Sequence, residues 1–463
     1  AGKVTLSATS GSVTYGTASK TFTATRLGDG ALSVTDDNST ATASISNGTV
    51  TVTGLGSLVA GTKVKVTVSA AAGTNHNAAS ATYTLTITNA KISGSVSISG
   101  TNTYGSTLTS AVSGLSPSDA KLEYQWYKNS TNSNSGGTAI SNATSKNFTA
   151  TSNAFESYVY LVVTASKANY ETTTFTSNVI NKIAKRPITV TAGSATKVYD
   201  GTALTCDDYE ITSGNITVSS HKLVITPVSS ITNVGSTQNI IEAKITNSSE
   251  NNMATYYDIT VLPGTLTVTA KSITANGITV NTIADQTYTG SAIKPAPVVK
   301  DGTKTLVSGT DYTVAYPSDV TSAGSKTITI TGKGNYTGTR TVKYNIVKAT
   351  PTLTASAVSV NYNATATTTV TYNGDGALSV KSNDTSIATA TISGKTITVT
   401  GVKAGSTTLT ITAAEGTNYA PKTITINVTV NKIAGKVTLS ATSGSVAYGT
   451  TSKTFTASRL GDG

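Results

Sequence analysis

The run Thr396-Ile397-Thr398-Val399-Thr400 places an apolar side chain at every second position. Successive side chains of a β-strand point to opposite faces of its sheet, so this alternation is typical of a half-buried strand. Alternation of Thr with Val or Ile returns along the whole chain, and turn residues such as Gly, Asn and Asp separate the runs. The pattern therefore predicts an all-β protein.

The expected strands are grouped in units, because alternating segments that end on a lysine recur every 77 to 91 residues. These lysines are Lys91, Lys182, Lys271, Lys348 and Lys432. A unit of that length, with a strand about every ten residues, fits a seven-strand β-sandwich. We therefore predict five sandwich domains, at residues 1–91, 92–183, 184–271, 272–348 and 349–433.

The first thirty residues of the chain return almost unchanged as its last thirty. They differ at three positions, where Ala447, Thr451 and Ser458 replace Thr14, Ala18 and Thr25. Similarity at a fixed period indicates a modular array, so the chain holds one 433-residue repeat and, at residues 434–463, a partial domain that starts the next. Thirty residues are too few to fold alone. We expect downstream sequence, or strands donated by a neighbouring molecule, to complete that sheet.

Charge is sparse in this chain. The 33 Lys+Arg and 22 Asp+Glu residues give a net charge of +11, but charged residues make up only 12% of the sequence. The lysines are scattered singly and form no basic stripe, so we predict no nucleic-acid partner. No apolar run approaches the ~18 residues of a membrane-spanning helix. One cysteine, Cys206, excludes a disulfide framework within the chain.

Two aromatic positions recur once per domain. A tyrosine precedes a turn near each domain start, at Tyr15, Tyr104, Tyr199, Tyr288, Tyr362 and Tyr448. A short motif precedes each final strand, at Asn75-His76, Asn169-Tyr170, Thr255-Tyr256, Asn335-Tyr336 and Asn418-Tyr419. Tyr can bury its ring while its hydroxyl stays hydrogen-bonded. We interpret both sets as parts of the domain cores, and a platform of rings for sugars is the alternative.

The sequence resembles the bacterial immunoglobulin-like repeats of surface-exposed adhesins and stalk proteins. Residues 383–412, NDTSIATATISGKTITVTGVKAGSTTLTIT, look like the Big-type repeat, and residues 188–202, ITVTAGSATKVYDGT, look like the YDG repeat of secreted bacterial proteins. The fourth domain, with DQTYTGSAIKP at residues 285–295, is similar to another adhesin repeat. In the second domain, Trp126 matches the strand-C tryptophan of an Ig-like sandwich, although the flanking cysteines are missing.

This resemblance implies a tandem array of Ig-like β-sandwich domains arranged end to end as a rod. A ten-residue strand spans about 33 Å, so five units would give a rod on the order of 150–200 Å. The domain boundaries are short and carry no Gly/Ser or Pro tract that could act as a flexible hinge. We therefore expect the rod to be stiff.

No pattern in the sequence points to a catalytic centre. The two histidines, His76 and His221, cannot form a metal cluster, and the adjacent pairs Asp36-Asp37 and Asp207-Asp208 do not have the spacing of a Ca²⁺ loop. A Gly-rich phosphate loop between a strand and a helix is also missing. We predict that the chain is no enzyme and has no cofactor and no metal site.

Two local sites are candidates. Many surface Ig-like domains carry a Lys–Asn isopeptide bond promoted by a buried acid, and by this resemblance Lys197, Asp200 and Glu242 supply suitable residue types in the third domain. Trp126 and Tyr127 are candidate ligand contacts in the second domain, which alone carries a Trp and has a long polar loop at residues 129–137.

The leading hypothesis is a structural stalk or filament segment of a long, repetitive, extracellular bacterial surface protein, which gives length and stiffness. Its expected partners are neighbouring copies or adjacent repeats of itself, and cell-wall polymer, a glycan or a host surface. The alternative is an adhesion module in which one domain, 92–183 in preference, recognises a glycan or host protein. Both hypotheses place the chain at the cell surface or in an extracellular filament.

Overall fold

The computed structural model describes residues 1–460, and these residues form β-strands joined by turns, with a single short 3₁₀ turn, η1 (Leu55–Ser57). The prediction of an all-β protein is confirmed. Contacts group the chain into two compact units. One unit holds Ala1–Ala195, Thr205–Ser230 and Thr237–Leu266, and the other holds Thr196–Leu204, Ile231–Ser236 and the chain from Thr267 onward. The division falls inside the third domain.

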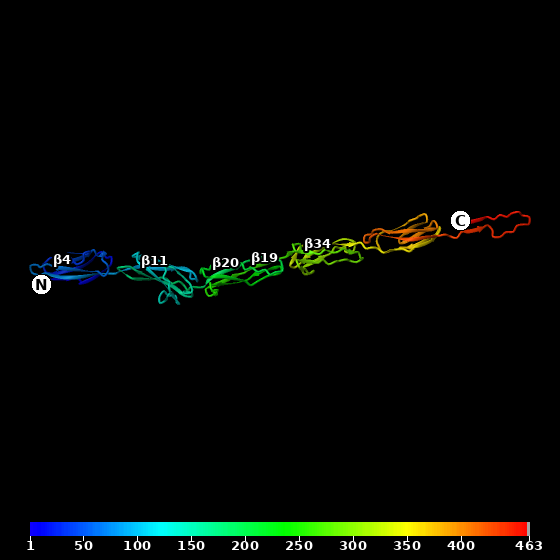
Figure 1. Cartoon of the computed structure of the whole chain (residues 1–463). Helices are drawn as coiled ribbons and strands as arrows, with labels where there is room; N and C mark the ends of the chain where they lie inside the picture. Colours follow the sequence, from blue (N-terminus) through cyan, green and yellow to red (C-terminus); the bar gives the residue numbers. More distant parts are fainter. Residues whose placement is uncertain (461–463) are drawn as a thin grey trace. The chain divides into compact units, whose positions relative to one another are not determined.

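The first domain is a sandwich of two four-stranded sheets (Figure 1, blue). Its strands are β1 (Lys3–Leu6), β2 (Ser10–Thr14), β3 (Lys20–Leu27), β4 (Leu32–Asp36), β5 (Thr42–Ser46), β6 (Thr49–Thr53), β7 (Lys63–Ala70) and β8 (Ala79–Thr88). The sheet orders are β1-β3-β6-β5 and β2-β8-β7-β4, with only β2 and β8 parallel. Between the sheets, the Phe22 ring stacks on the Tyr83 ring at 4.0 Å between centroids.

The second domain pairs a three-stranded sheet, β10-β11-β14, with a four-stranded sheet, β13-β12-β15-β17 (Figure 1, cyan). The strands are β10 (Ser93–Ser99), β11 (Thr107–Ser116), β12 (Lys121–Asn129), β13 (Thr138–Ala139), β14 (Phe148–Thr149), β15 (Tyr158–Ser166) and β17 (Thr173–Thr176). Trp126 lies at the centre of the core, where its ring stacks on Phe148 at 5.4 Å.

The third domain contains a three-stranded sheet, β20-β18-β24, in which β18 and β24 run parallel, and a hairpin, β21-β23. These strands are β18 (Arg186–Ala192), β20 (Tyr209–Ser213), β21 (Lys222–Pro227), β23 (Ile241–Thr246) and β24 (Tyr257–Leu262). The other strands of this domain lie at the division between the two compact units: β19 (Ala195–Val198), β22 (Gly235–Asn239) and β25 (Gly264–Thr269).

The fourth domain has the sheets β27-β29-β30 and β28-β34-β32-β31. Its strands are β27 (Ile278–Val280), β28 (Gln286–Thr287), β29 (Val299–Asp301), β30 (Lys304–Thr305), β31 (Tyr312–Ala315), β32 (Gly324–Gly332) and β34 (Thr339–Val347). The core of this domain also takes in Tyr199 and Val268 from the end of the third domain.

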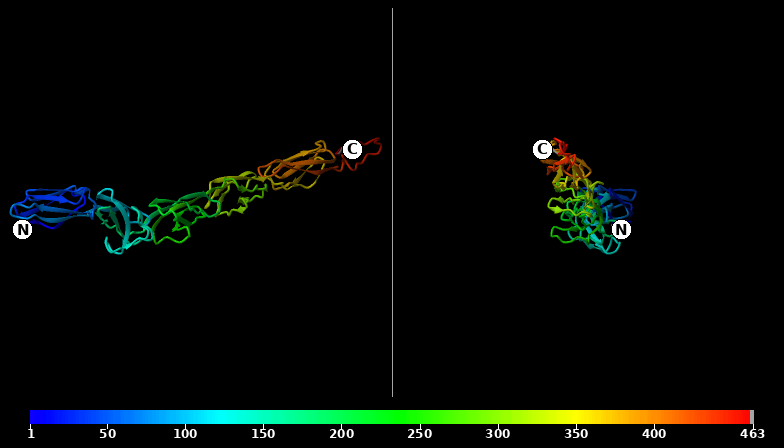
Figure 2. Two further views of the ribbon diagram at one scale, coloured as in Figure 1. Left: turned by 60° about the vertical axis from the view of Figure 1, so that its left-hand side comes forward. Right: turned by 90° about the vertical axis from the view of Figure 1, so that its right-hand side faces the viewer.

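The fifth domain repeats the design of the first, and the two share the sequence GDGALSV, at residues 28–34 and 374–380. The sheet β36-β43-β42-β39 corresponds to β2-β8-β7-β4, and its strands lie side by side in both figures (Figures 1 and 2, orange). The second layer holds β37-β41-β40 and the pair β35-β38. The bounds are β35 (Leu353–Thr354), β36 (Val358–Asn361), β37 (Thr365–Thr369), β38 (Thr371–Tyr372), β39 (Leu378–Ser382), β40 (Ala388–Ser393), β41 (Thr396–Gly401), β42 (Gly405–Ala413) and β43 (Lys422–Asn431).

The alternating run that opened the sequence analysis lies in β41, where Ile397 and Val399 are fully buried. The threonines between them point to the opposite face of the strand, so one face is buried and the other is more exposed to solvent. Each of the domains has a core of this kind, built mainly from apolar residues of its own strands, and the third and fourth cores also include a tyrosine of the domain before them. The chain is therefore a tandem array of Ig-like β-sandwiches.

Residues 434–460 form a hairpin of β44 (Lys436–Leu439) and β45 (Ala457–Leu460). Its register, Lys436 opposite Leu460, is that of Lys3 opposite Leu27 in the first domain. Apolar positions that are buried there are open here: Val4 is 7% exposed and Val437 is 68% exposed. The hairpin therefore presents the core face of a first-type domain without its cover. Residues 461–463 of the predicted partial domain lie outside the described residues.

Candidate functional site: the domain junctions

The tyrosine that precedes the first turn of each domain lies beside the place where the chain leaves that domain, because the two segments are joined by a backbone hydrogen bond. In every domain its backbone N–H donates to a carbonyl at the exit of the domain, which is the last residue of the final strand in four domains and Ala184, eight residues beyond β17, in the second. These bonds are Tyr15 to Thr88 (2.9 Å), Tyr104 to Ala184 (2.9 Å), Tyr199 to Thr269 (2.8 Å), Tyr288 to Val347 (2.9 Å) and Tyr362 to Asn431 (3.0 Å). We call these five residues the turn tyrosines. Each turn tyrosine therefore lies where the next domain begins.

Two residues after the accepting carbonyl, the chain pairs with a loop of the next domain. The N–H groups of Ala90, Lys271 and Ala349 donate to the backbone carbonyls of Asn169, Asn335 and Asn418, each at 3.0 Å. The contact is a short parallel pairing, for which the structure records β9 (Ala90–Lys91) with β16 (Tyr170–Glu171), β26 (Lys271–Ser272) with β33 (Tyr336–Thr337), and the bridge Ala349 to Tyr419. Each linker is thereby bound to the domain that follows it.

The side chain of the same asparagine reaches back to the preceding domain. Its Oδ1 accepts a backbone N–H from Ala60 to Asn169 (3.1 Å), from Val234 to Asn335 (2.8 Å) and from Ala323 to Asn418 (2.9 Å). Each donor directly precedes a glycine with positive φ: Gly61, Gly235 and Gly324. Glycine adopts a positive φ more readily than any other residue, so each donor lies beside a position that favours glycine.

The aromatic residue after the asparagine meets the turn tyrosine edge-to-face. The ring centroids lie 5.6 Å apart in Tyr15–Tyr170, 5.6 Å in Tyr199–Tyr336 and 5.4 Å in Tyr288–Tyr419, with interplanar angles of 72°, 77° and 76°. This is a favourable geometry for two aromatic rings. We call Asn169-Tyr170, Asn335-Tyr336 and Asn418-Tyr419 junction pairs.

The junction between the second and third domains keeps the plan with other residues. Arg186 N–H donates to the Tyr256 carbonyl at 2.9 Å, and Arg186 pairs with Tyr257 in parallel register, so the junction pair here is Tyr256-Tyr257. Tyr257 meets Tyr104 edge-to-face at 5.7 Å and 69°, and Tyr256, in the asparagine position, stacks on Tyr104 at 4.4 Å. The sequence alignment of Thr255-Tyr256 with the other pairs is therefore wrong by one residue.

Arg186 supplies the polar contacts that the asparagine makes elsewhere. Its guanidinium donates from Nε to the Tyr104 carbonyl (2.7 Å), from Nη2 to Ser106 Oγ (2.9 Å) and from Nη1 to Asn215 Oδ1 (2.8 Å). The planar guanidinium fork can satisfy several acceptors at once, which suits a contact between two domains. Thr217 Oγ1 adds a bond to the Gly105 carbonyl at 2.9 Å.

The junctions correct the interpretation of the recurring rings as parts of single-domain cores. Several rings are buried, with Tyr104 4%, Tyr199 7%, Tyr257 3% and Tyr336 2% exposed, but each contacts a ring of the neighbouring domain. Sequence reasoning placed these rings in the cores, where Tyr104, Tyr199 and Tyr336 do lie, but it did not foresee that the same rings also contact the neighbouring domain. It missed Arg186 entirely, since a lone arginine before a strand carries no pattern.

Burial at two junctions shifts tyrosine ionisation. Burial, with a smaller contribution from Tyr104, raises the pKa of Tyr257 to about 12. Burial and the adjacent Asp301 carboxylate likewise raise the pKa of Tyr336, whose hydroxyl donates to Asp301 Oδ2 at 3.2 Å. Lys271 Nζ, from the linker, lies 2.6 Å from Asp301 Oδ1. The Tyr336 hydroxyl, the Asp301 carboxylate and the Lys271 ammonium thus form one polar group beside the ring contact.

The predicted ligand contacts lie in the second domain, away from the junction pairs. Trp126 is fully buried, and its Nε1 donates to the Ser145 carbonyl at 2.9 Å, so it has no surface to offer a ligand unless the core opens. Tyr127 is half-buried on the opposite face of β12 and stacks on Tyr160 at 5.3 Å. A binding role for this domain stays a prediction that rests on Tyr127.

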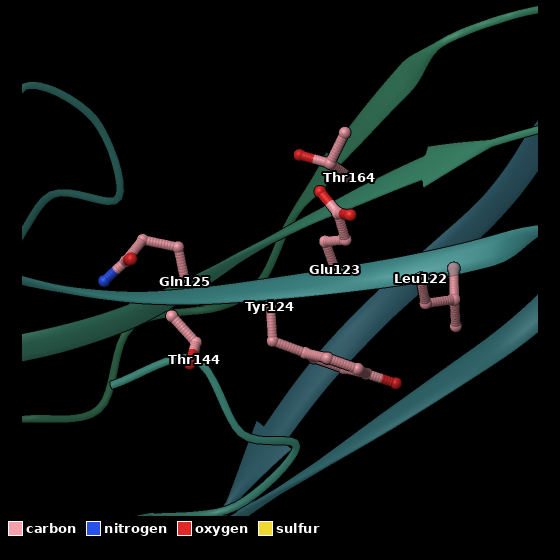
Figure 3. Close-up of a pocket in the computed structure, with 6 residues that line it drawn as sticks. All are labelled: Leu122, Glu123, Tyr124, Gln125, Thr144 and Thr164. Atoms are coloured by element: carbon pink, nitrogen blue, oxygen red, sulfur yellow. The ribbon is translucent and has the colours of Figure 1, made fainter. Parts of the chain in front are cut away.

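A shallow hollow of about 450 Å³ lies along β12, but its lining residues do not converge. Figure 3 shows Glu123 and Thr164 on one side of the strand and Tyr124 with Thr144 on the other. Gln125 is engaged by its own domain, since its Nε2 donates to the Trp126 and Ile140 carbonyls, both at 2.9 Å. Small-molecule sites need a few polar groups aimed at one point, and this hollow lacks that arrangement.

The three residues of the isopeptide hypothesis are placed differently from one another. Lys197 Nζ lies 2.7 Å from Asp200 Oδ1 and also donates to the backbone and side-chain oxygens of Thr202. This bond, with those from Thr202, holds the pKa of the Asp200 carboxyl well below its usual range. Glu242 is exposed on β23 and belongs to the other compact unit. Lys197 and Asp200 thus form an ion pair, and the covalent bond stays a prediction.

Among the described residues, no group of three or more His, Cys, Asp or Glu side chains is placed to hold a metal ion. Within residues 1–460, no helix combines the length and apolar character needed to cross a membrane.

Comparison with known proteins gives likeness in structure only. No family model and no curated protein matches the sequence. Domains 4 and 5 of the S-layer protein SbsC are 26% identical over 29% of this chain and 89% of that chain, with a TM-score of 0.18. A longer SbsC structure is 16% identical over 99% of this chain, which spans 62% of that chain, also with a TM-score of 0.18. A three-domain immunoglobulin segment of titin is 9% identical over 93% and 99%, with a TM-score of 0.19. With scores this low, the similarity adds nothing to what the sheets themselves establish.

Proposed function

We propose that this chain is a structural segment of a long, repetitive surface protein, in which the tandem domains provide length and the junctions provide stiffness. The observation that carries the proposal is the repetition of one junction design at all four links between domains. A turn tyrosine, a backbone pairing and an aromatic contact occur at every link, and residues needed only for solubility would not repeat this combination.

The energies of these contacts are sufficient to restrain a linker. Each junction with an asparagine has two hydrogen bonds, worth about 1 kcal/mol each, and an edge-to-face ring pair worth about 0.5–1.5 kcal/mol. Together they contribute roughly 3 kcal/mol, which opposes the entropy cost of ordering the linker. A flexible Gly/Ser linker has no such term and leaves its domains free to reorient.

Composition and resemblance support an extracellular bacterial setting for this segment. The Big-type and YDG-type motifs are repeats of secreted and surface proteins, and one cysteine and one methionine in 463 residues suit an oxidising environment. The uncovered core face of the hairpin at 434–460 supports association with adjacent repeats or neighbouring copies, whose strands would complete it.

Small-angle X-ray scattering of the full chain tests the proposal. A triple variant, Asn169→Ala with Asn335→Ala and Asn418→Ala, removes the side-chain link at three junctions and leaves the sandwiches intact. We expect the variant to have a shorter maximum dimension and a broader distribution of interatomic distances, because freed junctions bend.

The matched control replaces three exposed asparagines away from the junctions, Asn132, Asn276 and Asn427, by alanine. Its scattering should equal that of the original chain. The proposal fails if the original chain already scatters as a freely jointed set of domains, or if both triple variants change the curve equally.

A further inference from the structure

The fifth domain carries the preceding half of a junction on an exposed face. Tyr362 N–H bonds the Asn431 carbonyl at 3.0 Å, as every turn tyrosine does at its own domain exit. Two residues on, Ile433 occupies the position of Ala90, Lys271 and Ala349, whose N–H groups pair with the next domain. Tyr362 is 47% and Ile433 44% exposed, whereas Tyr104 and Tyr199 at filled junctions are 4% and 7% exposed.

The same face presents the backbone N–H that a junction asparagine would accept. Ala404 directly precedes Gly405, which has a φ of 157°, just as Ala60, Val234 and Ala323 precede left-handed glycines. In those three cases the N–H of the residue before the glycine bonds the asparagine side chain. Tyr362, Ala404 and Ile433 therefore supply the three elements that a junction pair contacts, and we call them the exit surface.

The first domain carries the following half of a junction, in a loop closed by the same backbone bond as the loop of the fifth domain. In its loop, Gly73 N–H bonds the His76 carbonyl at 3.0 Å, and Thr74 N–H bonds Asp29 Oδ2 at 2.9 Å. The loop of the fifth domain, which is engaged, has the matching bond from Gly416 N–H to the Tyr419 carbonyl at 3.0 Å, and its Asp375 Oδ2 accepts the N–H of Asn418, one position further along than Thr74, at 2.8 Å. Asn75-His76 thus stands where Asn418-Tyr419 stands.

The chain itself identifies which domain follows the exit surface. Residues 434–463 repeat residues 1–30 with three differences, and the hairpin β44–β45 has the register of β1–β3. A first-type domain therefore begins directly after Ile433. Its junction pair is Asn-His, and an imidazole can meet a tyrosine ring edge-to-face as a phenol does.

We infer that the exit surface, Tyr362, Ala404 and Ile433, is the docking surface for the Asn75-His76 loop of a second copy of the first domain, so that consecutive 433-residue repeats join as the domains within a repeat do. The Ile433 N–H donates to the asparagine carbonyl, the Ala404 N–H donates to the asparagine side chain, and the imidazole covers Tyr362. This inference deepens the proposed function, because it extends the restrained junctions from one repeat to the array.

The test is hydrogen exchange, resolved to single amides, on two chains. One is the 463-residue chain, and the other is the same chain followed by a second copy of residues 31–92, which completes the first-type domain after Ile433. We expect the Ile433 and Ala404 amides to exchange at least about tenfold more slowly in the longer chain. Tyr362→Ala in the longer chain should abolish that slowing. Tyr209→Ala is the control, because Tyr209 is 45% exposed, close to the 47% of Tyr362, and it should leave the slowing unchanged.

The amides of Ala90, Lys271 and Ala349 serve as references for filled junctions in the same samples. Equal exchange of Ile433 in both chains, with these references protected, overturns the inference and leaves the proposed function standing. Free exchange of the references themselves would contradict the proposed function instead. Equal effects of Tyr362→Ala and Tyr209→Ala would show that the protection does not come from the exit surface.

Discussion

At the scale of single residues, the asparagine of each of the three Asn-Tyr junction pairs makes two kinds of contact at once. Its main chain accepts the linker N–H and its side chain accepts an N–H of the preceding domain, so one residue ties the linker and both domains together. Asn335 adds a third bond, from Nδ2 to Asn233 Oδ1 at 3.0 Å. An aspartate of the same shape could not donate that bond, and a carboxylate would need to be desolvated.

Gly105, which follows the turn tyrosine of the second domain, lies where the third domain approaches the second closely enough to exclude a side chain. A Cβ at this position would lie 2.3 Å from Thr217 Oγ1 of the third domain, and the residue has a φ of 73°. We expect Gly105→Ala to cost about 1 kcal/mol from backbone strain and about 1 kcal/mol more from the lost Thr217 bond. Urea unfolding followed by the fluorescence of Trp126, the single Trp, reports the stability of the second domain.

Gly136→Ala is the matched control for that substitution. Gly136 has nearly the same φ, 72°, in the same domain, but nothing lies within 4 Å of its added Cβ. It should therefore show the strain cost alone, about 1 kcal/mol. Equal losses in the two variants would mean that the Gly105 contact with the third domain contributes nothing to stability.

How much of this the sequence could predict depends on the range of the interaction. The alternation in Thr396–Thr400 determined a buried strand face, since burial in a strand follows from period alone. The once-per-domain Tyr and Asn-Tyr positions were visible, but a single-sequence pattern cannot say whether a ring packs inside its own domain or on the next one. Trp126 shows the same ambiguity, because an aromatic beside a polar loop fits a ligand contact as well as a core.

At the scale of elements, the junctions depend on very short parallel pairings such as β9 with β16 and β26 with β33. Two-residue pairings are weak alone, so the rings and side chains beside them supply the remaining stabilisation. At the second junction Tyr257 makes several of these stabilising contacts: its ring packs on Tyr104, and its hydroxyl is hydrogen-bonded to His221 Nδ1 at 2.9 Å.

The raised pKa of Tyr257 predicts an alkaline weakness at this junction. The folded chain holds the pKa at about 12, above the value of about 10 in an unfolded chain. A raised pKa means that the contribution to stability is complete below pH about 10 and is lost as the pH rises through about 12. We expect the urea midpoint of the second and third domains to fall over that interval.

Tyr257→Phe should reduce this pH dependence, because the phenyl ring keeps the packing and cannot ionise, while Tyr104, whose pKa burial also raises, retains its own share. Tyr209→Phe, at an exposed tyrosine of the same domain, should leave it unchanged. Urea midpoints measured by circular dichroism across the alkaline range decide between the two. A Tyr257→Phe chain that loses stability as steeply as the original chain would contradict the assignment to Tyr257.

At the scale of the whole molecule, five different sandwiches make one repeat, and their sequences differ far more than their junctions do. The second junction replaces asparagine by tyrosine and recruits an arginine, yet it keeps the parallel pairing and the edge-to-face ring. The domain interiors need only alternate apolar residues, whereas the links need particular groups at particular places. These shared features are the ones on which the proposed structural role rests.

The most direct test of the central claim measures residual dipolar couplings of the first and second domains, isotopically labelled within the full chain and weakly aligned. Domains held by Asn169, Tyr170 and Tyr15 must share one orientation relative to the alignment axis. We predict that a single alignment tensor fits the couplings of both domains. Two tensors of clearly different magnitude, one for each domain, would show independent motion and would contradict the claim that the junctions restrain the array.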